Sequence, residues 1–141
     1  MKRISKGTSS MPDLQTQFDV VRLILGKKTE DALNLLSAFY KVAAPEIRVG
    51  TIKGKRKTVY AVYVGRERKI YAMNSDIFYN PFIVLHEFYH HLRSLGTEHR
   101  GSEDHANKYA KQFLHSYVSV LRCNANSNTT SNKNLRTGDL N

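Results

Sequence analysis

The residues best able to do chemistry in this 141-residue chain lie in one short segment, H-E-F-Y-H, which runs from His86 to His90. On a helix, residues four positions apart lie one turn apart on the same face, so the two imidazoles could reach a single metal ion. Glu87 would lie beside them, able to contact a metal-bound water but poorly placed to be a ligand. This spacing therefore predicts a metal site with a general base next to it.

A catalytic zinc site usually has three protein ligands, so one more must come from downstream. In a last helix that begins near Ser102, Glu103 shares a face with the apolar core positions, which favours Glu103 as the third ligand. Asn107 lies one turn further along the same face, where its amide could hydrogen-bond the other ring nitrogen of a ligating histidine. The competing candidates are His99, which comes next, and then Glu98, Asp104 and His105.

This ligand set indicates a hydrolase that uses one Zn²⁺ per chain. Zinc held by two neutral imidazoles and a carboxylate lowers the pKa of its water, and Glu87 accepts the proton as the hydroxide attacks a peptide carbonyl. Glu87 then delivers this proton to the leaving amine. We therefore expect a zinc metalloendopeptidase that acts on a peptide or protein substrate.

Hydrophobic periodicity predicts the elements that must position these residues. Two N-terminal helices are expected from Pro12 to Gly26 and from Thr29 to Ala43, and the active-site helix from Pro81 to Leu95. The last helix is expected to end near Cys123. Between the helices, β-branched stretches predict a small antiparallel or mixed sheet of about three strands, at 47–49, 59–64 and 70–73. Residues 74–80 are expected to form a loop, and the fold class is α+β.

The expected active-site helix is apolar around almost its whole circumference, which predicts a buried central element. A buried, unpaired carboxylate costs several kcal/mol, so the alternative that His86 and His90 are ordinary core histidines must also account for Glu87. His91 faces away from His86 and is expected to contact the helix surface or a loop. The strand at 69–74 is either an edge that aligns an extended peptide or an interior strand.

The motif H-E-F-Y-H, followed by E-D-H-A-N-K-Y-A-K-Q-F, resembles the gluzincin group of zinc metallopeptidases, in which a second helix carries E-x-x-x-D or E-x-x-x-N. It is most similar to the ImmA/IrrE-type peptidases, and the resemblance covers residues 51–114. It implies a minimal zincin fold with His86, His90 and Glu103 as zinc ligands. It also implies Glu87 as the general base and acid, and Asn107 as the residue that orients a ligand histidine.

Charge is the other strong feature of the sequence, because 22 Lys and Arg against 12 Asp and Glu give a net charge of +10. Part of this charge is concentrated in one expected hairpin, at Lys53, Lys55, Arg56, Lys57, Arg66, Arg68 and Lys69. These residues are either a solvated surface or a set of nucleic-acid contacts. The alternative functions are therefore a nucleic-acid-associated protein with a structural or vestigial zinc site, or a DNA-recruited protease of the SprT-like type.

Length and composition set the remaining expectations. We expect one catalytic domain at 1–123, with residues 1–10 frayed, and a disordered polar tail at 124–141. The lone Cys123 excludes an intramolecular disulfide and a cysteine cluster, so histidine and carboxylate must hold any metal. Without a long apolar run or a signal-like start, the chain is expected to be cytoplasmic and to have no membrane partner.

Overall fold

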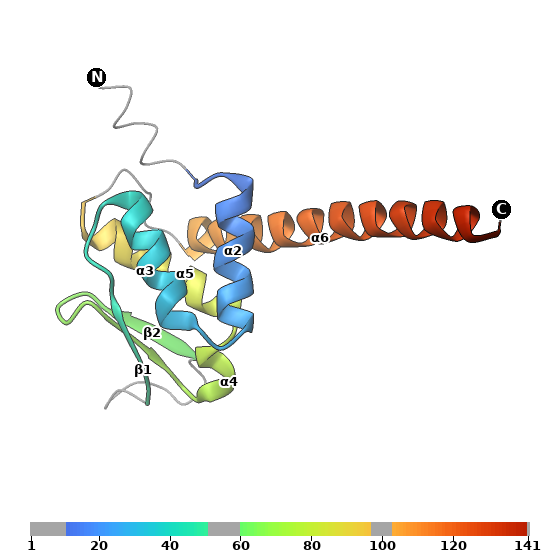
Figure 1. The fold of residues 1–141 in the computed structure, drawn as a ribbon. Helices are drawn as coiled ribbons and strands as arrows, with labels where there is room; N and C mark the ends of the chain where they lie inside the picture. The colour runs from blue at the N-terminus through green and yellow to red at the C-terminus, as the bar shows by residue number, and fades with distance from the viewer. Residues whose placement is uncertain (1–10, 51–59, 97–102, 141) are drawn as a thin grey trace, which may run out of the picture.

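The computed structural model describes residues 11–50, 60–96 and 103–140, with side chains described as far as residue 126. It confirms an α+β fold in which helices pack on a small three-stranded sheet (Figure 1). The elements are α2 (Leu14–Leu25), α3 (Thr29–Tyr40), β1 (Glu46–Val49), β2 (Ala61–Val64), β3 (Lys69–Ala72), α4 (Ser75–Phe78), α5 (Pro81–Ser94) and α6 (Glu103–Leu140).

The two expected N-terminal helices are confirmed as α2 and α3. Asp13 caps α2, since its carboxylate accepts a hydrogen bond from the Thr16 backbone N–H at 2.8 Å. The second helix ends at Tyr40, three residues before the expected end, because Lys41 takes a left-handed conformation with φ of 60°. The helices pack against each other, and α2 also packs along α6.

The sheet has the strand order β1-β3-β2, with β1 parallel and β2 antiparallel to the central strand β3. The sheet is therefore mixed, and the strand at 69–72 is an interior strand. The alternative in which this strand forms an edge for a substrate is wrong, because β3 pairs with a strand on each side. Among the described strands, β2 is the outer strand that packs on α5.

Two asparagines fix the connection from the sheet to α5. Asn74 accepts a hydrogen bond from the Ile77 N–H at 3.0 Å and so starts the short helix α4, where a loop was expected throughout. Asn80 accepts one from the Ile83 N–H at 3.2 Å and caps α5. Pro81 occupies the first turn of α5, where a missing N–H costs nothing.

Helix α5 is the buried central element that the sequence predicted. Its core side chains Val84, Leu85, Phe88 and Leu92 are at most 1% exposed. It packs against α6 on one side and β2 on another. The inward-facing polar residues of α5 are therefore held between two well-packed surfaces, which restricts where their side chains can point.

Helix α6 differs from the expectation, since it continues to Leu140 instead of giving way to a disordered tail after Cys123. Between Glu103 and Leu140 the sequence contains no proline and a single glycine, Gly138, so no residue before the last turn breaks the helix. Its C-terminal half projects away from the rest of the molecule (Figure 1). Although α6 is long, neither it nor any other described helix is apolar enough to cross a lipid bilayer.

Because the distal part of α6 projects from the domain, removing residues 127–141 should change the free energy of unfolding by less than about 0.5 kcal/mol. Urea unfolding of the truncated and full chains, followed by circular dichroism, measures this difference. A chain that ends at Lys111 is the control, because it loses the fully buried Phe113 and should not fold. A large destabilisation on removal of 127–141 would show that this segment supports the domain.

Candidate metal centre

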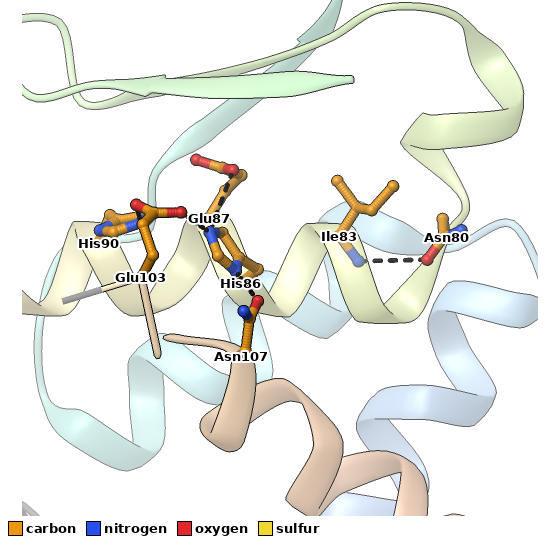
Figure 2. A network of polar contacts seen from close by, with 7 residues as sticks. All are labelled: Asn80, Ile83, His86, Glu87, His90, Glu103 and Asn107. Atoms are coloured by element: carbon orange, nitrogen blue, oxygen red, sulfur yellow. Dashed lines mark hydrogen bonds and ion pairs between the residues drawn. The ribbon is translucent and has the colours of Figure 1, made fainter. Parts of the chain in front are cut away.

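Three side chains from two helices converge on one point. The Nε2 atom of His86 lies 2.9 Å from one carboxylate oxygen of Glu103, and the Nε2 atom of His90 lies 2.9 Å from the other. One potential ligand atom from each residue lies within 4.8 Å of the others. Figure 2 shows Glu103 reaching from the start of α6 toward the two imidazoles on α5. The structure thus brings together the three residues that the sequence proposed as ligands.

Asn107 determines which nitrogen of His86 is available to a metal. Its side-chain oxygen lies 2.8 Å from Nδ1 of His86, one turn along α6 from Glu103 (Figure 2). An amide oxygen can only accept, so Nδ1 carries a proton, and Nε2 is the nitrogen that could offer a lone pair to a metal on the side of Glu103. This is the contact predicted for Asn107, and it leaves Nε2 free to act as a ligand.

The contact between His86 and Glu103 therefore needs positive charge between its two atoms. A lone pair on Nε2 and a carboxylate oxygen repel each other at 2.9 Å unless a proton or a cation lies between them. Two imidazole nitrogens and a carboxylate are a donor set that suits zinc, and three protein ligands leave one position for water or substrate. The residues present therefore fit a zinc ion.

Glu87 lies beside this cluster as a buried carboxylate, 8% exposed. One of its oxygens is 3.9 Å from Nε2 of His86. Burial, followed by repulsion from Glu103, raises the pKa of Glu87 to about 8, although a hydrogen bond from the Tyr63 backbone N–H opposes the shift. Its position next to the ligands, but outside the group that could hold the ion, is the one expected for a general base.

Two cavities open on either side of this carboxylate. The larger, of about 450 Å³, is bordered by His90 and Glu103, and the smaller, of about 180 Å³, by His86 and Asn107. Glu87 and Ala61 line both of them. The two cavities are therefore adjacent, and together they are called the groove, which follows β2 past the candidate metal site.

His91 makes one of the two contacts expected for it, the contact with a loop. It is fully buried, so the expected surface contact is wrong, although it does contact a loop through the Ala43 carbonyl at 2.8 Å. A carbonyl only accepts, so Nε2 carries the proton, and Nδ1 accepts a hydrogen bond from the Tyr63 hydroxyl at 2.8 Å. Burial lowers the pKa of His91, which favours this neutral form.

The connection between Tyr63 and His91 is the feature that sequence reasoning missed. Tyr63 lies on β2 and also contacts the Ser94 hydroxyl at 3.0 Å, so it ties β2 to α5 along the groove. Its backbone holds Glu87 at the same time. The available signal was a histidine within a helix that is apolar on almost every side, because such a residue must find hydrogen-bond partners.

The two described competitors, Asp104 and His105, do not join the cluster. Asp104 and His105 are exposed, and Asp104 forms an ion pair with Lys108 at 3.3 Å. The competing ligands Glu98 and His99 lie outside the described residues, as do Lys53, Lys55, Arg56 and Lys57 of the basic hairpin. The described members of that hairpin are Arg66, Arg68 and Lys69, of which Lys69 lies 3.7 Å from a Glu46 carboxylate oxygen.

The raised pKa of Glu87 predicts a pH dependence for the metal-free protein. The unfolded chain loses this proton near pH 4.5 and the folded chain near pH 8, so folding binds a proton between these values and stability falls as pH rises. Glu87→Gln removes this dependence. The free energy of unfolding of the variant, relative to that of wild type, should therefore increase by up to about 4 kcal/mol from pH 5 to pH 8. Urea unfolding at several pH values, in the presence of a metal chelator, measures this difference. The exposed Glu30→Gln is the control. If the stability of wild type and of Glu87→Gln changes with pH in parallel, the prediction is wrong.

Comparisons of the chain with protein-family models, with curated proteins and with solved structures found no match. The case for a metal centre therefore rests on the side chains themselves. Three observations support it: the spacing of the two histidines on α5, the approach of Glu103 to both of them, and the hydrogen bond from His86 to Asn107.

Proposed function

We propose that this chain is a zinc-dependent metallopeptidase. The observation that carries the proposal is the convergence of His86, His90 and Glu103 within 4.8 Å, beside a groove that Glu87 lines. A carboxylate held next to a set of metal ligands, but not among them, is the arrangement that hydrolysis by an activated water requires. The same residues carry the resemblance to gluzincins.

A bound zinc ion would supply a Lewis acid that polarises the substrate carbonyl and lowers the pKa of water. The chain's own residues do the rest. Glu87 accepts the proton of the attacking water and returns it to the leaving amine. Burial raises the pKa of Glu87 in the metal-free chain, and a bound zinc ion would favour the ionised carboxylate, which is the form that accepts a proton. The Tyr63 backbone orients Glu87, and Asn107 orients His86.

The position of β2 supports a peptide as the substrate. This strand borders both halves of the groove and, among the described strands, pairs only with β3. An extended peptide could therefore bind by adding to β2, with its backbone held by hydrogen bonds. The bond to be cleaved would then lie opposite Glu87.

Metal binding is the first test of the proposal. The purified chain should bind one zinc ion, and His86→Ala should abolish binding because it removes a ligand. Asn107→Ala should weaken binding by about 10- to 100-fold, since His86 would lose the partner that fixes its ring. Competition with a chromogenic chelator measures these affinities, and the exposed Lys108→Ala is a matched control on α6. A chain that takes up no zinc would refute the proposal.

Catalysis is the second test. Glu87→Gln keeps the size of the side chain and all three ligands but removes the base, so zinc should still bind while peptide cleavage falls by at least about 100-fold. Mass spectrometry of a digested peptide library measures cleavage, and atomic absorption measures the zinc content. Equal cleavage by the variant and the wild type would show that Glu87 is not the base.

A further inference from the structure

The two halves of the groove differ in chemistry. The smaller cavity is lined by Tyr60, Phe82 and Ile83, which make this end largely apolar. The larger cavity extends away from the cluster to Arg93 and Ser94 at the end of α5. A peptide bound across Glu87 would therefore meet apolar side chains on one side and the cation Arg93 on the other.

Helix α5 and strand β2 run in the same direction along this groove. Ala61, at the start of β2, shares the smaller cavity with Phe82 and Ile83. Further along β2, the Tyr63 hydroxyl bonds to His91 and Ser94. A substrate that lies along β2 must therefore pass the candidate metal site and then reach Arg93.

Arg93 follows His90 by three positions, so it lies on nearly the same face of α5, about 4.5 Å further along the axis. The carboxylates that line the same cavity are Glu87 and Glu103, and both belong to the candidate metal site. No carboxylate in the described part of the chain forms an ion pair with Arg93. Arg93 is exposed, so its guanidinium group is open to a ligand as far as the described residues show. A carboxylate fits this group through two parallel hydrogen bonds.

We propose that Arg93 is a specificity residue that binds a substrate carboxylate, an inference that rests on the proposed peptidase function. The middle of the two-histidine pair lies about 7.5 Å from Arg93 along α5, which is about two residues of an extended peptide. The preferred substrates are therefore peptides with a carboxylate about two residues from the cleaved bond and an apolar side chain at a similar distance on the other side. The carboxylate belongs either to an acidic side chain or to a free C-terminus.

Matched peptides separate these two sources. The test uses the zinc-loaded full chain and octapeptides in which Phe and Glu lie four residues apart, in both orders and with blocked ends. In the first counterpart, Gln replaces Glu. The second counterpart is the Gln peptide shortened so that this Gln is its last residue and carries a free C-terminal carboxylate. We expect the acidic or free-ended peptide to have a kcat/KM about 10- to 100-fold above that of its blocked Gln counterpart. The peptide with the higher kcat/KM shows whether the carboxylate comes from an acidic side chain or from a free C-terminus.

Two variants assign this preference to Arg93. Arg93→Glu should abolish the preference and favour a Lys-containing peptide, because the charge at that end of the groove is reversed. Lys111→Glu makes the same change of net charge at an exposed position on α6 outside the groove, so it should keep the preference. If Arg93→Glu keeps the preference for a carboxylate, or if wild type shows none, the inference is wrong although the chain is a peptidase.

A binding measurement keeps the inference testable apart from activity. Fluorescein-labelled forms of the same octapeptides are titrated with zinc-loaded Glu87→Gln, with and without Arg93→Glu, and followed by anisotropy. Tighter binding of the acidic or free-ended peptide, lost only with Arg93→Glu, supports the inference. Equal binding of all peptides refutes it. If the zinc-loaded wild type cleaves no peptide, the proposed function fails, and the binding result still decides the role of Arg93.

Discussion

The packing of α6 on α5 is the constraint on which the rest of the site depends. Ala106, Ala110 and Phe113 on α6 are fully buried, and the two alanines are small enough to let the helices approach closely. Glu103 and Asn107 flank Ala106 on this side of α6, so the apolar contact carries both to the histidines of α5. Apolar burial therefore supports an arrangement of polar groups that repel one another and would not assemble by themselves.

This arrangement has an electrostatic cost in the metal-free chain. Glu87 is buried and lies near Glu103, so the metal-free fold holds two carboxylates in one small region. Desolvation and repulsion from Glu103 both oppose the ionised form of Glu87, and together they raise its pKa to about 8. A divalent cation removes much of the repulsion, since it replaces the missing positive charge between the imidazoles and Glu103. The strain is thus concentrated where a metal would relieve it.

A second set of contacts sets the shape of the groove. The Tyr63 hydroxyl, the buried His91 and the Ala43 carbonyl form a partly buried chain of hydrogen bonds from β2 through α5 to the segment before β1. Because every member is hydrogen-bonded, this chain can hold β2 at a fixed position over α5 without an unpaired polar group. The position of β2 in turn decides where a substrate would lie relative to Glu87 and how it would reach Arg93.

The features that depend on a single helix could be predicted from the sequence. Helical periodicity placed His86 and His90 on one face of a buried helix, and the apolar stripe of α6 identified Glu103 and Asn107, because both depend on spacings of three or four residues. The strand order was not predictable in this way, since the pairing of β3 with β1 and β2 joins distant segments. Nor was the role of His91, whose partners lie 28 and 48 positions away. Periodicity describes one element at a time, whereas these contacts depend on how several elements pack together.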